Sequence, residues 1–243
     1  VMTRNNQMPN EVYRPHEPIQ VYVTHVVNSL KGPQVFVSRT SPGLLKRFFE
    51  QEVPEIYDGT IEIVSIAREA GTRSKVAVRS RDKNVDPVGT TVGPRGERVQ
   101  SIVNKLGGEN MDIVQWDSDD TTFIANALNP AEVDDVIFDP NDDHACVVLV
   151  PDDQLSLAIG KRGQNARLAA RLTGYKIDIE PKSSEKDIVA KINAESQNDD
   201  SDDSASADTS KSTSANDHDS DSADSSSSSD VGSDQTDDSD QKE

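Results

Sequence analysis

The sequence Gly-Lys-Arg-Gly stands at residues 160–163, between two segments with the apolar spacing of helices, and Gly-Pro-Arg-Gly occupies the same place at residues 93–96. The spacing from Gly93 to Gly160 equals the spacing from Gly107 to Gly174, and we expect the latter two glycines to end the helices that follow the tetrapeptides. A single Gly-x-x-Gly occurs by chance in many chains. Two copies inside one pattern, at the spacing that the rest of the pattern shares, indicate an internal duplication of a unit of about 70 residues.

Both units have the same predicted order of elements, α-β-β-α-α-β. Apolar residues at helical spacing and alternating β-branched runs define the elements. Ser41-Pro42 is a good helix start, because Ser can cap free amides and Pro suits the first helical position. In the first unit we expect a helix from Pro42, strands at 60–67 and 74–80, a short helix ending at Val92, a helix to about Leu106 and a strand at 111–116. In the second unit we expect a helix at 119–128, strands at 133–138 and 145–150, a short helix ending at Ile159, a helix to about Leu172 and a strand at 176–179.

The N-terminal residues predict two further strands, at 19–27 and 34–38. Two strands cannot form an independent domain, so they look like the end of a small β-barrel whose beginning is missing. The chain starts at Val1 rather than Met, and we expect it to be part of a longer protein.

The C-terminal residues differ in composition from everything before them. Residues 195–243 contain 16 acidic and two basic residues, and so carry −14 of the net charge of −19. Such a segment cannot bury enough apolar surface to offset its ordering entropy, so we predict a disordered acidic tail. Two hypotheses stay open for it: a solvating extension, or a competitor of nucleic acid for basic loops, which truncation after Lys191 would distinguish.

A Gly-x-x-Gly loop between two helices is suited to binding phosphate. Glycine lets the backbone approach closely, and the amides at the start of the next helix carry its positive dipole end. Successive amides in such a turn form a concavity that binds anions. The side chains between the glycines add cations, and Arg171 continues this positive edge. The candidate RNA-binding residues are Gly93, Pro94, Arg95, Gly96, Arg98, Gly160, Lys161, Arg162, Gly163, Asn165 and Arg167.

The duplicated unit resembles the bacterial, type II KH domain, whose loop clamps about four nucleotides. Its sequence is similar to the NusA family of bacterial transcription termination and antitermination factors. The stretches that carry this resemblance are 37–40, 42–47, 54–59, 84–89, 93–99, 151–161 and 163–170. The resemblance implies an α+β fold with the C-terminal part of an S1 (OB-fold) domain at 1–40 and KH domains at 41–117 and 118–184. The disordered Ser/Asp-rich acidic tail, which we place at 185–243 from its composition, matches no part of the family.

The resemblance also implies a function. The chain would clamp single-stranded nascent RNA with two KH domains at the bacterial RNA polymerase, and so modulate pausing, termination and antitermination. It would be a cytoplasmic, monomeric RNA-binding protein without enzymatic activity or membrane contact. The expected partners are RNA, RNA polymerase and other antitermination factors. The family's polymerase-binding domain is absent from these residues.

Other chemistry has little support in the sequence. The single cysteine, Cys146, excludes an internal disulfide and is expected to be a small buried core residue. The histidines show no ligand spacing, so we predict no metal and no cofactor. We expect Trp116 to pack at the junction of the two units, and Asp152 or Asp153 to cap a helix.

Two alternatives to a transcription factor stay open. One is an RNA-processing enzyme with KH and S1 modules, such as a polynucleotide phosphorylase, although its modules run in the opposite order with one KH domain. The other is a ribosome-bound or assembly protein with KH folds. A nuclease assay and co-sedimentation with ribosomes would test them.

Overall fold

The computed structural model describes residues 1–190. Most of the predicted acidic tail lies outside the described residues. Residues 185–190, which the prediction assigned to the tail, are helical, and Ile188 among them is buried. The ordered chain therefore continues past the predicted boundary. No helix within residues 1–190 has the length and apolar character needed to cross a bilayer.

The first repeat, residues 41–117, has the predicted order of elements. Strand β4 pairs antiparallel with β3 and parallel with β5, giving a three-stranded sheet in the order β3-β4-β5. The short helix α2 was not predicted. The elements are α1 (Pro42–Glu52), α2 (Pro54–Tyr57), β3 (Ile61–Glu69), β4 (Arg73–Ser80), α3 (Pro87–Val92), α4 (Glu97–Lys105) and β5 (Asn110–Gln115).

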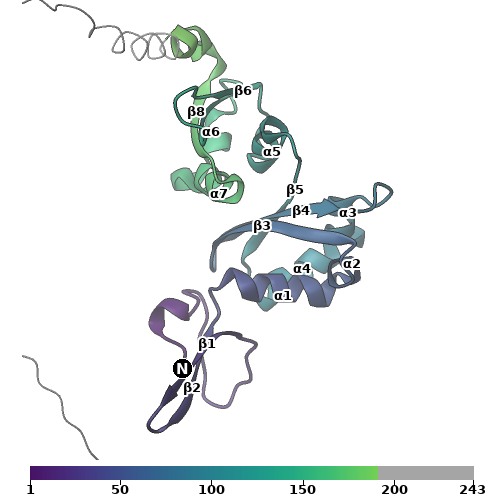
Figure 1. Cartoon of the computed structure of the whole chain (residues 1–243), viewed down its shortest axis with the longest axis vertical. Helices are drawn as coiled ribbons and strands as arrows, with labels where there is room; N and C mark the ends of the chain where they lie inside the picture. Colours follow the sequence, from purple (N-terminus) through teal and green to yellow (C-terminus); the bar gives the residue numbers. More distant parts are fainter. Residues whose placement is uncertain (191–243) are drawn as a thin grey trace, which may run out of the picture. The chain divides into compact units, whose positions relative to one another are not determined.

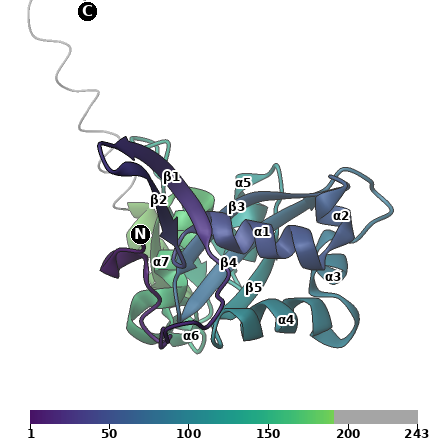
Figure 2. The ribbon, with the colours of Figure 1, turned by 90° about the horizontal axis from the view of Figure 1, so that it is seen from below.

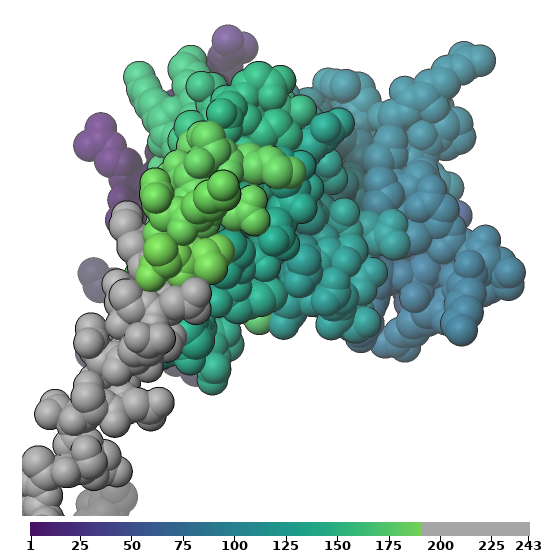
Figure 3. All heavy atoms as spheres, turned by 90° about the horizontal axis from the view of Figure 1, so that it is seen from above, coloured from purple at the N-terminus to yellow at the C-terminus, as the bar shows by residue number. Residues whose placement is uncertain are grey.

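The second repeat, residues 118–184, follows the same plan without a counterpart of α2. Its sheet has the order β6-β7-β8, again with one antiparallel and one parallel pair. Figure 3 shows β8 and the residues after it, in light green, on the surface of this repeat. The elements are α5 (Asp120–Ala127), β6 (Asp135–Phe138), β7 (Ala145–Val150), α6 (Leu155–Ile159), α7 (Gln164–Thr173) and β8 (Lys176–Pro181).

The two N-terminal strands form an antiparallel hairpin of β1 (Tyr22–Ser29) and β2 (Gly32–Ser38). Among residues 1–190 no third strand joins this sheet, so its place in an S1 barrel stays a prediction. Figure 2 shows the hairpin beside the start of α1. A Cβ at Gly43 would lie 2.6 Å from Cζ of Tyr22, so glycine permits this close contact.

Helix α1 shows how the local sequence sets the structure. The hydroxyl of Ser41 accepts a hydrogen bond from the Gly43 amide, as predicted for an N-cap. The apolar side of the helix is buried against the first sheet. This core of the first repeat contains Leu44, Leu45, Phe48, Phe49, Ile61, Val76, Val78, Ile102 and Leu106 among its buried residues.

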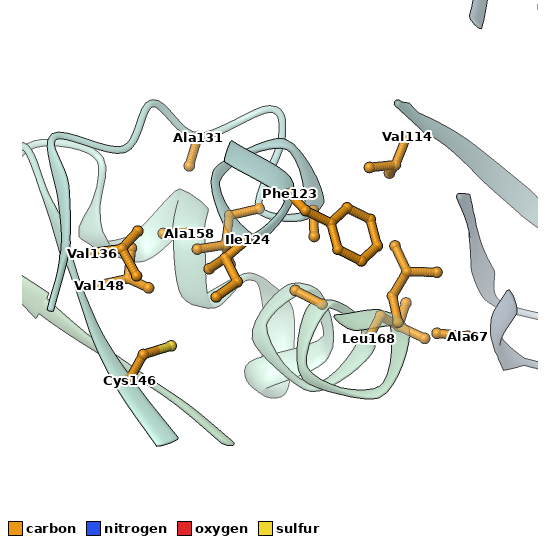
Figure 4. Close-up of a cluster of buried hydrophobic side chains, with 14 of the residues drawn as sticks. Ala67, Val114, Phe123, Ile124, Ala131, Val136, Cys146, Val148, Ala158 and Leu168 are labelled. Carbon is orange, nitrogen blue, oxygen red and sulfur yellow. The ribbon is translucent and has the colours of Figure 1, made fainter. Parts of the chain in front are cut away.

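A second core joins the two repeats. Side chains of a strand alternate between faces, so Ala77 points away from the first core and packs with Phe123 and Leu168 of the second repeat. Ala67 and Val114 contribute to the same cluster, which Figure 4 shows in close-up. Figure 1 shows the first sheet between α1 and α4 on one side and α5 and α7 on the other. The repeats therefore share a hydrophobic interface.

Three predictions about single residues have clear outcomes. Trp116 packs against the shared core, with its ring centroid 6.4 Å from that of Phe123, as expected for the junction. Cys146 is buried, and burial raises the pKa of its thiol to about 11. The helix cap at Asp152 or Asp153 is wrong, because α6 begins only at Leu155 and Gln154 occupies its N-cap position.

Candidate nucleic-acid interface

The two Gly-x-x-Gly loops have nearly the same backbone. The first glycine has φ 78° and ψ 171° in the first loop, and φ 75° and ψ 175° in the second. The third residue, Arg95 or Arg162, has φ 53° or 56°, and the last glycine has φ 76° or 71°. The amide of the last glycine donates to the carbonyl of the first at 3.0 Å and 3.1 Å. The duplication in sequence is therefore a duplication of loop geometry.

Both loops hold an arginine in a conformation that disfavours arginine. Positive φ costs an L-residue roughly 1–2 kcal/mol, and only Gly adopts it freely. Among residues 1–190, His16 is the only other non-glycine residue with positive φ. Sparsely populated backbone conformations cluster at binding and catalytic sites. Arg95 and Arg162 both fit that pattern.

The loops are open to solvent. Pro94, Arg95, Lys161 and Arg162 are all exposed. Their charged groups project beside a turn whose amides form an anion-binding concavity and lead into α4 or α7. The structure thus places these predicted residues together at each loop, with cations at both.

The first glycine of each loop is needed for packing as well as for its φ angle. A Cβ at Gly93 would lie 2.6 Å from Cγ of Arg98, and a Cβ at Gly160 would lie 2.8 Å from Cβ of Asn165. Arg98 and Asn165 are separated by the same spacing as the two first glycines, so they are equivalent positions of the two repeats. Each covers the first glycine of its loop.

Arg98 is partly committed to the protein itself. Its Nη1 donates to Glu55 Oε2 at 2.9 Å and to the Thr90 carbonyl at 2.7 Å. These bonds connect α4 to α2 and α3. Its side chain is 27% exposed, which leaves part of the guanidinium accessible.

Asn165 differs from its predicted role as an RNA contact. The residue is only 3% exposed, and its Nδ2 donates to the Leu128 and Ala158 carbonyls at 2.9 Å and 3.0 Å. Its Oδ1 is buried without a hydrogen-bond partner among residues 1–190. The Asn165 side chain is shorter than that of Arg98 and does not reach solvent from the equivalent position. Its hydrogen bonds connect α7 to α6 and to the end of α5.

Arg167 lies at the second loop but is ion-paired across the interface. Its Nε donates to Glu69 Oε1 at 2.6 Å, and its Nη1 donates to the Arg162 carbonyl at 3.3 Å. Gln164 donates to Glu69 Oε2 at 2.8 Å. The hydrogen bond from Arg167 holds the pKa of the Glu69 carboxyl below its ordinary value. The end of β3 in the first repeat therefore contacts the start of α7, directly after the second loop, which sequence reasoning missed.

A buried ion pair organises the β3–β4 turn. Glu109 accepts hydrogen bonds from Arg68 Nε at 2.8 Å, Ser74 Oγ at 2.6 Å and the Gly71 amide at 2.9 Å. The side chains of Arg68 and Glu109 are 1% and 0% exposed. Sequence alone gave no sign of this pair, because a Glu after the helix-ending glycines is expected at the surface.

Apolar groups border the second loop. Leu157 and Ile159 of α6 are 47% and 37% exposed, whereas Leu155 and Ala158 of the same helix pack on the core. Exposed apolar side chains beside a phosphate-binding loop can hold unstacked bases. No group of three or more potential metal ligands occurs in residues 1–190.

Comparison with known proteins places these two repeats in a family. Residues 39–116 match the NusA-like first KH domain, and residues 120–187 match the NusA-like second KH domain. Together the two matches cover more than half of the chain.

Named relatives agree with this assignment. The chain is 62% identical over 184 residues to the transcription termination/antitermination protein NusA of Bacillus subtilis, covering 76% of this chain and 49% of the relative. It is 57% identical over 184 residues to NusA of Halalkalibacterium halodurans, covering 76% and 48%. It is 49% identical over 179 residues to NusA of Thermus thermophilus, covering 74% and 46%. The chain thus spans about half the length of these relatives.

These names describe a transcription factor rather than an enzyme, in agreement with the prediction of a non-enzymatic chain. The tandem repeats with their Gly-x-x-Gly loops are NusA-type KH domains. The chain belongs to the NusA family of transcription termination and antitermination proteins.

Proposed function

We propose that this chain binds single-stranded RNA by clamping its sugar–phosphate backbone with the two Gly-x-x-Gly loops. The observation that carries the proposal is the pair of loops with one backbone geometry, both exposed and both bearing cations. Amides and cations together satisfy a phosphate, and the glycines allow the strand to come close. The bases are free to lie against exposed apolar groups such as Leu157.

The shared core supports a single extended site rather than two independent ones. The linker between β5 and α5 is short, and Ala77 and Leu168 belong to one buried cluster. Once one loop holds an RNA strand, the second contact is nearly intramolecular, which raises the overall affinity. The proposed RNA is therefore a continuous single strand that spans both repeats.

The proposed role of the whole protein comes from its relatives. They are named transcription termination/antitermination proteins, and this chain covers about half of their length. We extend that name to this chain as follows: it contacts nascent RNA at the bacterial RNA polymerase and modulates pausing, termination and antitermination. Other antitermination factors are further partners of this proposed complex.

Salt dependence of RNA binding tests the backbone clamp. With about four phosphates per domain the two repeats contact on the order of eight, so the slope of log affinity against log salt is expected to be at most about −5 to −6. A filter-binding series with an unstructured RNA long enough to span both repeats measures this slope. A slope near zero would contradict backbone clamping.

Charge reversal at the loops tests the site. Asp replacements at Pro94 and Arg95 together with Lys161 and Arg162 are expected to abolish most binding and leave the fold intact, because Asp tolerates positive φ better than most residues. Lys46 and Arg47 are exposed on α1, and replacing both with Asp is the matched control for the second loop. This variant is expected to bind RNA nearly as tightly as wild type. Affinity that survives reversal of both loops would place the site elsewhere.

A further inference from the structure

A pocket lies beside each Gly-x-x-Gly loop, and the two pockets are equivalent. The pocket at the first loop has a volume of about 420 Å³, and the pocket at the second about 230 Å³. Five residues that line the first pocket, between Gly89 and Arg98, have equivalent positions in the second repeat. All five equivalent residues, between Ser156 and Asn165, line the second pocket. Each repeat therefore has an equivalent pocket beside its Gly-x-x-Gly loop.

The rest of the lining differs in charge. The first pocket is completed by the carboxylates of Glu55 and Asp86, both from the first repeat. The second pocket is completed by the uncharged Pro130 and Gln164 and by Arg73, which belongs to β4 of the other repeat. Arg73 pairs with Asn110 of β5, and the equivalent residue of β8, Lys176, pairs with Ala145 of β7, so the second repeat has an alanine where the first has Arg73 and supplies no such cation from its own sequence.

Arg73 is placed rigidly and still has hydrogen-bonding capacity. Asp112 accepts from its Nε at 2.7 Å and from its Nη2 at 2.9 Å. Its Nη1 has no hydrogen-bond partner among residues 1–190, and its side chain is 31% exposed. A guanidinium fixed by one carboxylate loses little freedom when it binds a second anion. Lys75 Nζ also lies 3.2 Å from Asp112 Oδ2, so the group of Arg73, Lys75 and Asp112 has two cations and one carboxylate.

The contacts between the repeats keep Arg73 at the second pocket. Gln164, at the start of α7, donates to Thr72 Oγ1 at 3.1 Å, one residue before Arg73. Lys75, two residues after it, donates from Nζ to the Asn129 carbonyl of the second repeat at 2.9 Å. Arg73 is thus flanked on both sides by direct contacts with the second repeat.

We propose that Arg73 binds a phosphate of the RNA strand held by the second loop, beside Lys161. The second RNA site is then built from both repeats, and the first repeat sets its affinity. This inference rests on the proposed RNA-binding function and names one further residue of that same site. The ligand is the backbone phosphate of a single strand, and it carries no base preference.

The test is a double-mutant cycle on RNA affinity with Arg73→Gln, Lys161→Gln and the double variant. Losing a charge-assisted contact is expected to weaken binding about tenfold. The salt slope is expected to fall by about 0.7 for one phosphate contact of a single strand. The two losses are expected to be less than multiplicative, because both residues hold one phosphate. Arg73→Gln combined with Arg95→Gln in the first loop is expected to be multiplicative.

Arg79→Gln is the matched control. Arg79 is in the same strand, is partly exposed and is ion-paired with Glu62, but it does not line either pocket. Its loss is expected to leave affinity within twofold of wild type. Urea unfolding checks that each variant folds, and Arg73→Lys, which keeps the charge, is expected to recover most of the affinity.

Two outcomes would overturn the inference, and they differ from failure of the proposed function. One is that the wild-type chain binds RNA and the Arg73→Gln variant binds it with the same affinity. The other is independent, multiplicative losses for Arg73→Gln and Lys161→Gln. If the wild-type chain does not bind single-stranded RNA at all, the proposed function fails, and this inference fails with it.

Discussion

At the scale of single residues, the loops depend on glycine in two different ways. The first glycine of each loop is pressed against the residue five positions later, and a Cβ at Gly160 would also lie 3.0 Å from the backbone nitrogen of Asn165. The last glycine has nothing within 4 Å of the position that a Cβ would take, so only its φ of 71° at Gly163 opposes a side chain. Space and backbone strain can therefore be separated by experiment.

We predict that Gly160→Ala destabilises the chain more than Gly163→Ala. Gly163→Ala bears only the cost of positive φ, about 1–2 kcal/mol, whereas Gly160→Ala adds a clash with backbone that cannot move cheaply. The free energy of unfolding in urea measures both. Equal losses in the two variants would contradict the close contact between Gly160 and Asn165.

The exposure of the loop residues was easier to predict than the environment of their neighbours. Turn composition and repetition sufficed to predict that Arg95, Lys161 and Arg162 are exposed, because a Gly-x-x-Gly turn projects its middle residues outward. The burial of Asn165 was not predicted, because its side chain follows the local packing of α7 and not the charge pattern. The ion pair of Arg167 with Glu69 joins residues 98 positions apart, a contact that no local pattern reports.

At the scale of elements, the β3–β4 turn is the part of the first repeat that contacts the start of α7 in the second repeat. Glu109 accepts hydrogen bonds from Arg68 and the Gly71 amide and so fixes the turn, and Glu69 at the end of β3 pairs with Arg167 of α7. Helices and strands themselves follow local signals: Ser41 caps α1, as its sequence predicted, and Asp86 caps α3. Asp152 has a carboxylate that could also cap a helix, but no helix begins beside it, so the cap predicted from residue preference alone was wrong.

We predict that Glu109→Gln is strongly destabilising. Removing one partner of a buried pair leaves Arg68 as an uncompensated buried charge, at a cost of about 3–5 kcal/mol. Glu50→Gln, which removes the exposed pair with Arg47 on α1, is expected to cost less than about 1 kcal/mol. Denaturant unfolding of both variants checks the contrast. A loss below about 1 kcal/mol for Glu109→Gln would contradict the buried pair.

At the scale of the whole molecule, the interface between the repeats is the main feature that the sequence did not reveal. The sequence predicted the two units and their order because periodicity is local. It did not say which face of the first sheet the second repeat covers. Small residues at Ala67 and Ala77 let α7 approach that face, but isolated alanines in a strand are too common to predict an interface.

The interface gives stability a specific dependence on pH. The hydrogen bond from Arg167 lowers the pKa of Glu69 in the folded chain, so Glu69 contributes stability above its ordinary pKa of about 4.5 and loses it as pH falls below that value. We predict that wild type loses more free energy of unfolding than Glu69→Gln between pH 5.5 and pH 3.5. The difference is expected to stay below about 1 kcal/mol, because the pair is partly exposed.

Urea unfolding at a series of pH values measures this difference. Glu132→Gln is the control, because Glu132 is exposed and makes no salt bridge within residues 1–190. It is expected to follow the wild-type curve. Parallel curves for wild type and Glu69→Gln would show that the contact between the repeats does not depend on the Glu69 charge.

The most direct measurement is a titration of the isotope-labelled chain with an unstructured single-stranded RNA, followed by NMR at the backbone amides. We expect the amide signals of Arg95, Gly96, Arg162 and Gly163 to shift together and to saturate at one RNA strand per chain. Signals that shift elsewhere while these four stay in place would contradict phosphate binding by the two loops.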